Sequence, residues 1–311
     1  MKKLLASLFF VFTTLFTYGQ QFHVASYNVR YANPADEQRG NGWSQRCPVI
    51  CNQIAYESFD LVGMQEVLKS QFDDLSNRLS RDYGCIGVGR NDGKTSGEYA
   101  PIFYKKDRFI LLDSGCFWLS ETPDVPSKGW DAVLPRICSW GHFKCKDTGF
   151  EFLFFNLHMD HIGKKARVES AFLVQEKMKE LGRGKNLPAI LTGDFNVDQT
   201  HQSYDAFVSK GVLCDSYEKC DYRYATNGTF NNFDPNSFTE SRIDHIFVSP
   251  SFHVKRYGVL TDTYRSVREN SKKEDVRDCP EEITIKAYEA RTPSDHFPVK
   301  VELEFDQRQQ K

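Results

Sequence analysis

Apolar residues recur along this chain with two periods, and each period predicts one kind of element. Spacings of three and four residues predict helices over residues 45–57, 69–80 and 164–181. Alternating or short continuous apolar runs predict strands over residues 22–30, 60–66, 99–104, 109–112, 137–144, 151–158, 188–192, 243–248 and 297–305. Strands and helices mixed around one large core predict the α/β class, built as a sandwich.

Polar, chemically capable residues interrupt the apolar pattern where the predicted strands end or begin. Asn28, Glu66, His158, Asp194, Asn196 and Asp244 stand at strand ends, and Asp295 and His296 stand just before the last strand. A stable surface does not need so many acids and amides at strand edges. Because sites are built where strand ends meet loops, these residues are candidates for one functional site.

One domain accounts for the chain beyond residue 20. No repeat and no linker rich in Pro, Gly or Ser divides residues 21–311. Of the 311 residues, 40% are hydrophobic and 26% are charged, which excludes a disordered or low-complexity protein. The 40 basic and 42 acidic residues give a net charge of -2, so no strong basic field is available to hold nucleic acid non-specifically.

The first 20 residues have the composition of a secretory signal peptide rather than of a folded element. Two lysines at positions 2 and 3 precede a mostly apolar stretch over 4–16, and the small Gly19 precedes two glutamines. The stretch is short for a membrane span, although an uncleaved anchor is the alternative. We therefore expect cleavage near residue 20, export to a periplasm or beyond, and no membrane anchor on the mature protein.

Nine cysteines follow this segment, and an odd number cannot pair completely within one chain. No Cys-x-x-Cys pair is present, which weakens redox and zinc-ribbon interpretations. A chain of this length buries enough core without disulfides. Buried free thiols are therefore the expectation, with one or two disulfides after export as the alternative.

The candidate residues offer carboxylate and amide oxygens and no thiol. Such ligands suit a hard divalent cation, Mg²⁺ first and Mn²⁺ or Ca²⁺ next. His158 and His296 are then left for proton transfer or for contact with a phosphoryl oxygen. A cation beside a histidine–aspartate pair suits the hydrolysis of phosphate esters by in-line attack of water. Each residue taken singly could instead be an ordinary turn, cap or core residue.

Six segments strengthen this interpretation because, in order, they resemble the motifs of the endonuclease/exonuclease/phosphatase superfamily. They are Ser26-Tyr27-Asn28-Val29-Arg30, Gly63-Met64-Gln65-Glu66-Val67, Asn156-Leu157-His158, Thr192-Gly193-Asp194-Phe195-Asn196, Arg242-Ile243-Asp244-His245-Ile246-Phe247 and Ser294-Asp295-His296-Phe297-Pro298. The members of this superfamily are deoxyribonuclease-like, metal-dependent phosphohydrolases. The resemblance to them implies a four-layer α/β sandwich, in which two packed mixed β-sheets are flanked by helices.

The resemblance also implies a role for each matching residue. Asn28, Glu66 and Asp295 would form the metal site, with Glu66 as the direct ligand. His158 would donate to the scissile phosphate, Asn196 would hold a phosphate oxygen, and Asp194 would orient or activate water or bind metal. Asp244 would orient His296, which would be the general base or a phosphate contact.

A further stretch is similar to deadenylase-like members of the superfamily. It comprises Gly129-Trp130-Asp131, Leu134-Pro135-Arg136 and Trp140. Arg136 is a candidate to clamp a phosphate in a bidentate way, and Trp130 and His161 are further candidates for substrate contact. The alternative is a buried Arg136 paired with Asp131. Glu98 and Tyr99 either face the same site or form a solvated strand end.

These observations predict an exported, Mg²⁺-dependent phosphoric ester hydrolase. Phosphodiester hydrolysis, as in a nuclease, is the first expectation. Hydrolysis of phosphomonoesters, such as sugar phosphates, nucleotides or lipid head groups, is the second, and an inactive binding protein on the same fold is the alternative from another class. The partner is a phosphate ester, with nucleic acid or a nucleotide among the candidates, and no stable protein partner is implied. Residues 256–277 mix basic with acidic side chains, which favours a solvated loop.

Overall fold

The computed structural model describes residues 20–182, 184–267, 280 and 288–305. Its helices are α1 (Pro34–Gln38), α2 (Trp43–Tyr56), α3 (Lys69–Leu79), α4 (Lys164–Leu181), α5 (Gln202–Val208) and α6 (Ser216–Lys219). Its strands are β1 (Gln20–Asn28), β2 (Leu61–Gln65), β3 (Tyr83–Ile86), β4 (Ile102–Lys105), β5 (Phe109–Trp118), β6 (Ile137–Cys145), β7 (Glu151–His158), β8 (Ala189–Asp194), β9 (Cys214–Asp215), β10 (Tyr222–Tyr224), β11 (Asp244–Val248), β12 (Phe252–Val259), β13 (Tyr264–Val267), β14 (Tyr288–Arg291) and β15 (Val299–Phe305). The expected signal peptide lies outside the described residues, apart from residue 20.

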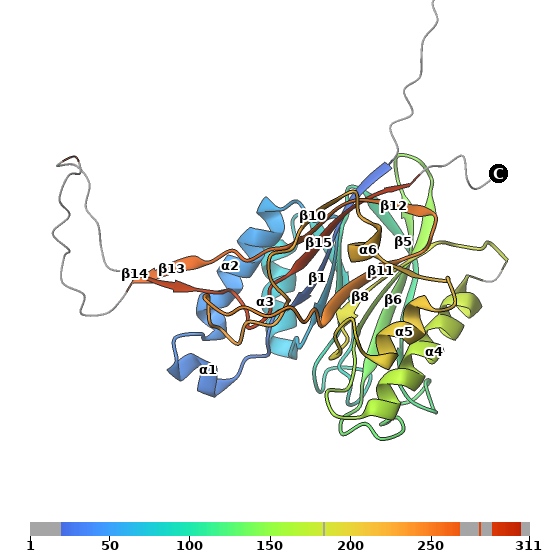
Figure 1. Ribbon diagram of the computed structural model, residues 1–311, viewed down its shortest axis with the longest axis horizontal. Coiled ribbons are helices and arrows are strands. Elements are labelled where there is room, and N and C mark those ends of the chain that lie inside the picture. Colours follow the sequence, from blue (N-terminus) through green and yellow to red (C-terminus); the bar gives the residue numbers. More distant parts are fainter. Residues whose placement is uncertain (1–19, 183, 268–279, 281–287, 306–311) are drawn as a thin grey trace, which may run out of the picture.

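The strands form two large mixed sheets and one separate hairpin. The order is β10-β12-β15-β1-β2-β4-β3 in the seven-stranded sheet and β5-β6-β7-β8-β11-β9 in the six-stranded sheet. The hairpin of β13 and β14 projects from one side of the molecule (Figure 1). β1 and β2 are parallel, as are β7 and β8, whereas β11 runs antiparallel to β8.

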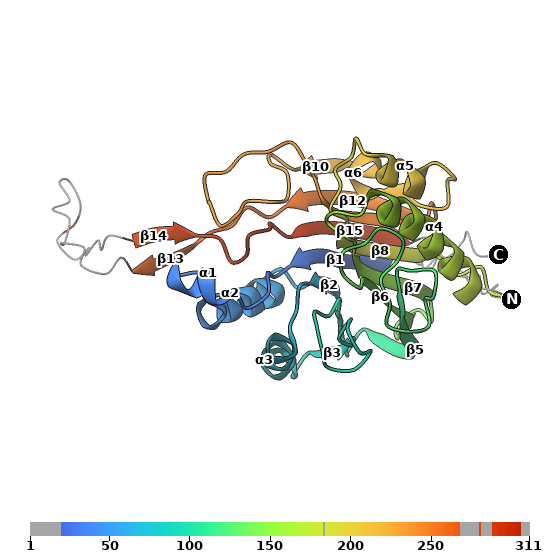
Figure 2. The ribbon, with the colours of Figure 1, turned by 90° about the horizontal axis from the view of Figure 1, so that it is seen from below.

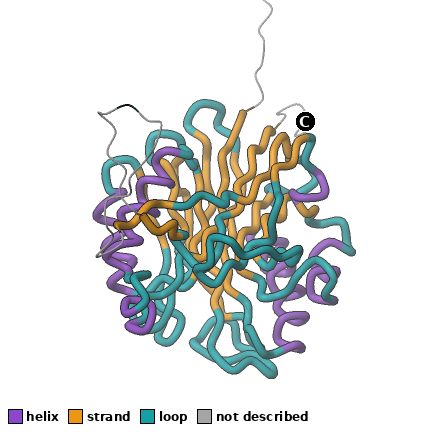
Figure 3. Tube along the Cα trace, turned by 60° about the vertical axis from the view of Figure 1, so that its left-hand side comes forward, coloured by secondary structure: helices purple, strands orange, loops and turns teal. Residues whose placement is uncertain are grey.

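Helices cover the outer face of each sheet, so the molecule has four layers (Figures 1 and 2). Ile50 and Ile54 of α2 and Leu75 of α3 pack with residues of the seven-stranded sheet, and Val174 of α4 and Phe207 of α5 pack with the six-stranded sheet. A core rich in phenylalanine fills the space between the sheets. Figure 3 shows the helices on both outer sides of the strands. The predicted sandwich of two mixed sheets flanked by helices is confirmed.

Alternation within the central strands decides which side chains enter the space between the sheets. In β1, Phe22 and Val24 belong to the core between the sheets, whereas Tyr27 packs with the helices. The period of two continues the inner series to Ser26 and Asn28. β7, β8 and β11 repeat this pattern, with Phe154, Ile190 and Ile246 among their apolar inner residues and a candidate site residue at one end. The candidate site is therefore an extension of the face that forms the core.

All of the predicted helices and strands are present, although several ends differ. β5 runs on to Trp118 because a register shift between Leu111 and Asp113 only interrupts its alternation. The expected solvated loop over 256–277 is wrong in its first part, where β12 reaches Val259 and β13 follows. A bulge between Val254 and Arg256 breaks the period of two there, which hid β12 from the sequence pattern. Residues 268–277 lie outside the described part.

None of the eight cysteines within the described residues is in a disulfide, which agrees with the first expectation. Cys47, Cys51, Cys138 and Cys145 are buried, whereas the other four are partly exposed. Cys279 lies outside the described residues. Within the ranges given above, no helix combines the length and the apolar composition needed to cross a membrane.

Candidate active site

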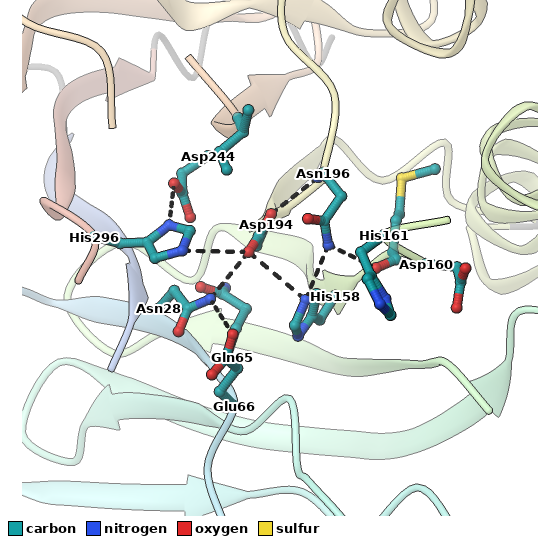
Figure 4. Close-up of polar contacts among 12 residues, drawn as sticks. Asn28, Gln65, Glu66, His158, Asp160, His161, Asp194, Asn196, Asp244 and His296 are labelled. Atoms are coloured by element: carbon teal, nitrogen blue, oxygen red, sulfur yellow. Dashed lines mark hydrogen bonds and ion pairs between the residues drawn. The ribbon is translucent and has the colours of Figure 1, made fainter. Parts of the chain in front are cut away.

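The candidate residues of both sheets meet at one end of the sandwich (Figure 4). Because β1 and β2 are parallel, Asn28 at the end of β1 and Glu66 just beyond β2 lie at the same edge. In the other sheet, Asp194 is paired with His158 of β7 on one side and with Asp244 of β11 on the other. Asp244 begins its strand rather than ending one as the sequence pattern suggested. It still reaches this edge, since β11 is antiparallel to β8.

A cavity of about 530 Å³ opens at this edge. Its lining includes six residues to which the resemblance assigns metal or catalytic roles: Glu66, His158, Asp194, Asn196, Asp295 and His296. Asn28 and Asp244 are buried behind this lining and bond to members of it. A larger hollow of about 1090 Å³ lies at the opposite end of β8 and carries no histidine in its lining, so it does not offer the same chemistry.

Asp194 is the centre of the polar contacts. Its Oδ1 accepts from the backbone N–H of Asn196 at 2.9 Å, and its Oδ2 accepts from Nδ2 of Asn28 at 2.9 Å. The same Oδ2 lies 3.6 Å from Nε2 of His158 and 3.9 Å from Nε2 of His296. Burial and the neighbouring Asp244 raise the pKa of Asp194 to about 7, so this carboxyl group can exchange a proton near neutral pH.

His296 and Asp244 form a buried ion pair. Nδ1 of His296 lies 2.8 Å from Oδ2 of Asp244. Burial acts to lower the pKa of His296, but the attraction of Asp244, aided by Asp194 and Asp295, outweighs it and raises that pKa well above its usual value. The imidazole is therefore protonated at neutral pH, and both of its nitrogens are donors.

His158, in contrast to His296, is neutral. Nδ2 of Asn196 lies 3.1 Å from its Nε2, and since an amide nitrogen only donates, Nε2 is the acceptor. The ring proton is then on Nδ1, which lies 3.8 Å from Oε2 of Glu98. Burial, together with the charges of Arg136 and Arg90, lowers the pKa of His158 well below its usual value. The cavity therefore combines one neutral and one protonated imidazole.

Carboxylates and one imidazole in the lining of the cavity offer ligand atoms for a cation. Glu66, His158 and Asp194 each offer a ligand atom, and these atoms lie within 4.8 Å of one another. Nη1 of Arg30 lies between two of the acids, 3.5 Å from Oδ2 of Asp295 and 3.9 Å from Oε2 of Glu66. A set dominated by carboxylate oxygens fits a hard divalent cation. Glu66 and Asp295, which already share the cationic Arg30, are the residues that would hold it, and Asp194 is left for proton transfer.

Asn28 holds these carboxylates in place rather than presenting its oxygen to them. Its Nδ2 donates to Oε1 of Glu66 at 3.1 Å and to Oδ2 of Asp194 at 2.9 Å. Its Oδ1 accepts from the backbone N–H of Arg30 at 3.0 Å. The orientation assigns Asn28 to the support of two carboxylates that would otherwise repel each other, and Glu66 remains the direct ligand that the resemblance implies.

The backbone is unusual at three positions of the site. Arg30, Glu66 and Asn196 have φ angles of 56°, 61° and 51°. Side chains other than glycine avoid this left-handed region because Cβ crowds the following carbonyl oxygen. Such conformations persist where surrounding contacts enforce them, often at active sites. Glu66 is enforced in this way, since its carboxylate accepts from Asn28 and, at 3.2 Å, from the backbone N–H of Tyr31.

Two of the three candidate substrate residues line the cavity. Arg136 and His161 line it, whereas Trp130 is not among its lining residues. The suggested pairing of Arg136 with Asp131 is wrong, because Nε of Arg136 lies 3.4 Å from Asp160 and its Nη2 lies 3.0 Å from Nδ1 of His161. Asp131 instead accepts from two backbone N–H groups at 3.2 and 2.7 Å in the first turn of α4, whose start it caps.

Sequence reasoning missed Arg90, which also lines the cavity. Its Nη1 and Nη2 donate to the two carboxylate oxygens of Glu98 at 2.7 and 3.0 Å. Burial raises the pKa of Glu98 in spite of this pairing. Glu98 therefore faces the site and is not part of a solvated strand end. Arg90 stands in an irregular segment without period or motif, so nothing local in the sequence marks it.

The arrangement provides what hydrolysis of a phosphate ester requires. Carboxylates can hold a divalent cation, and the cationic His296, Arg90 and Arg136 can meet phosphoryl oxygens. Asp194, with its pKa near neutrality, can take a proton from attacking water. The cavity brings these groups together although they come from both sheets.

Comparison with known proteins agrees with this assignment. The sequence profile of the Endonuclease/Exonuclease/phosphatase family matches residues 25–296. A solved mannosyl-6-phosphatase of Bacteroides thetaiotaomicron is 75% identical, with a TM-score of 0.85, over 91% of this chain and 100% of that one. A family member from Bacteroides vulgatus is 39% identical, with a TM-score of 0.78, over 92% of this chain and 100% of that one. Nocturnin of Xenopus laevis is 25% identical over 188 residues, which are 57% of this chain and 46% of nocturnin, and agrees with the predicted similarity to deadenylase-like members.

Proposed function

Because this chain belongs to the Endonuclease/Exonuclease/phosphatase family, we propose that it is a divalent-cation-dependent phosphatase of sugar phosphates, with mannose 6-phosphate groups as the first candidate substrate. The observation that carries this choice is the 75% identity to the mannosyl-6-phosphatase throughout that chain. The sequence by itself ranked phosphodiesters first. The likeness reverses that order, and phosphodiester hydrolysis becomes the second candidate.

The charges around the cavity support a phosphomonoester. A monoester carries up to two negative charges, whereas a diester carries one. Arg90, Arg136 and His296 can each donate to phosphoryl oxygens, in addition to a cation held by the carboxylates. A cavity of about 530 Å³ is also of the size that holds a small molecule.

The residues of the chain divide the proton transfers between them. Mg²⁺ held by Glu66 and Asp295 would polarise a phosphoryl oxygen and neutralise charge. Protonated His296, oriented by Asp244, donates from Nε2 to the phosphoryl group. The carboxylate of Asp194 accepts a proton from the water that attacks phosphorus. The bond from phosphorus to the sugar oxygen breaks, and the departing oxygen takes a proton from solvent, which gives the free sugar and phosphate.

Phosphate release from a panel of esters tests this function. We expect the purified protein with Mg²⁺ to hydrolyse mannose 6-phosphate at least about tenfold faster, as kcat/KM, than bis(p-nitrophenyl) phosphate, and to lose activity when EDTA is added. Faster hydrolysis of the diester would favour the nuclease-like alternative. No turnover of any ester with Mg²⁺, Mn²⁺ or Ca²⁺ would favour an inactive binding protein.

We also propose that residues 1–20 direct export, on the composition of this segment alone. Fractionation of cells that express the full chain, followed by N-terminal sequencing, tests the point. A mature protein that begins near residue 21 outside the cytoplasm is the expected result, and an intact chain in the cytoplasm would contradict it.

A further inference from the structure

We propose that Asp160 is a positioning residue that fixes Arg136 against the substrate phosphate, a role that deepens and rests on the proposed function. Asp160 follows β7 by two residues and does not line the cavity, whereas Arg136 does. Asp160 is 2% exposed and Arg136 is 4% exposed, so their contact is shielded from solvent. Within this low dielectric, the geometry of the pair is held more firmly than at a surface.

A single carboxylate organises two loops here. Oδ2 of Asp160 accepts from the backbone N–H groups of Val133 at 3.3 Å and Leu134 at 3.4 Å, and it lies 3.4 Å from Nε of Arg136. Oδ1 accepts from two backbone N–H groups of its own loop, at positions 162 and 163, at 3.0 and 2.8 Å. Asp160 thus joins the loop before β6, which carries Arg136, to the loop after β7.

Two further contacts hold the loop after β7 in place. Nη1 of Arg167 in α4 donates to the backbone oxygen of Asp160 at 2.9 Å, which fixes the second loop to that helix. A side chain at Gly163 would meet Oδ1 of Asp131 at 2.8 Å, and Asp131 itself caps α4. The loop after β7 is therefore held against α4, and the carboxylate of Asp160 joins it to the segment that carries Arg136.

This anchoring leaves one edge of Arg136 for a ligand. Asp160 accepts a hydrogen bond from Nε of Arg136. Nη2 of Arg136 must be the donor in its contact with Nδ1 of His161, because a guanidinium has no acceptor atom. Nη1 has no hydrogen-bond partner among the described residues. His161 must then carry its proton on Nε2 when neutral, so a second donor stands beside the guanidinium at the cavity. A planar guanidinium held on one side can offer its remaining donors to phosphate oxygens in a fixed direction.

Binding of inorganic phosphate, measured by titration calorimetry on the Mg²⁺-loaded protein, tests this role together with kinetics on mannose 6-phosphate. We expect D160N to weaken phosphate binding about tenfold and to raise KM more than it lowers kcat. R136A is expected to weaken binding by about 10- to 100-fold. D131N, which alters a neighbouring carboxylate that does not touch Arg136, is the matched control and should leave phosphate affinity within about twofold.

The double variant D160N/R136A separates positioning from general structural support. If Asp160 acts through Arg136, the double variant binds phosphate no more weakly than R136A, because the two losses share one cause. Losses that multiply would overturn the proposal, as would equal affinities of wild type and D160N.

R136K decides the same question should D160N fail to fold. Lysine keeps the charge but lacks the fork that contacts both Asp160 and phosphate. Affinity close to that of R136A is expected, and affinity close to wild type would overturn the proposal. If mannose 6-phosphate is not hydrolysed while these phosphate affinities behave as expected, the proposed substrate fails and the role of Asp160 stands.

Discussion

Asp244 binds one nitrogen of His296 at 2.8 Å, while the other nitrogen of the same ring lies 3.9 Å from Asp194. The imidazole thus stands between two carboxylates that belong to adjacent strands of one sheet. Asp244 is almost fully buried and keeps the ring protonated, and Asp194 lines the cavity. In the proposed mechanism the two acids therefore have different tasks: Asp244 orients the ring, and Asp194 acts at the reacting group.

Replacement of Asp244 by asparagine should lower kcat by about 100-fold or more while the fold persists. The amide cannot stabilise a charged imidazole, so His296 would lose the charge state and orientation that its donation requires. Phosphate release and a thermal melt of D244N measure the two properties. D113N alters an exposed acid of β5 and serves as the control. Activity of D244N within a few-fold of wild type would remove the pair from the mechanism.

Removal of one charge at Glu66 should weaken cation binding by at least about tenfold. Glu66 and Asp295 are the proposed ligands of the cation, and E66Q keeps the shape of Glu66 but not its charge. Calorimetric titration with Mn²⁺ measures the effect without reference to turnover. E98Q is a matched control, because Glu98 lines the same cavity but binds Arg90. Equal losses in the two variants would show that Glu66 has no special part in holding the ion.

A methyl group at Gly63 should destabilise the fold by about 3 kcal/mol, near the upper end of overpacking effects. Gly63 lies on β2 where the two sheets approach, and an added Cβ would overlap Oγ1 of Thr192 and Oδ1 of Asn156. Those two atoms are hydrogen-bonded to each other at 3.0 Å, so they cannot move away from the new Cβ without breaking that hydrogen bond. Urea unfolding of G63A gives the free energy, and G258A, where the new Cβ makes only an ordinary contact, should cost less. Similar values for both variants would contradict the close approach.

Acidification should lower the free energy of unfolding of the protein, because His245 is buried in its neutral form. Its ring is fully buried, its Nε2 lies 3.1 Å from the backbone oxygen of Val197, and burial lowers its pKa. Below pH 6.5 the unfolded chain takes up a proton that the folded chain does not, so the free energy of unfolding falls as pH falls. Between pH 7.5 and pH 5 we expect wild type to lose about 1–2 kcal/mol more than H245F.

Urea unfolding at both pH values measures this difference. Phenylalanine at position 245 keeps ring packing against Phe195 and Phe247 but cannot titrate. Parallel changes in the two proteins would mean that other groups carry the acid sensitivity.

Local patterns were sufficient to predict the sheets and most of the site. Alternation in β1 puts Asn28 on the same inner face as Phe22 and Val24, and this relationship is readable from spacing alone. The bulged β12 and the short elements escaped prediction, because a broken period or a few residues carry too little local signal. The helix over 164–181 coincides with α4, since its apolar spacing is regular and a glycine stands at each end.

By itself the sequence determined the α/β sandwich and the acids and imidazoles that meet at the cavity, because side-chain alternation and residue chemistry are local properties. Only the tertiary structure decided that Arg136 binds Asp160 rather than Asp131, that Arg90 enters the cavity, and that His158 is neutral while His296 is charged. These outcomes depend on burial and on the distance to charges far away in the chain, which no local spacing encodes.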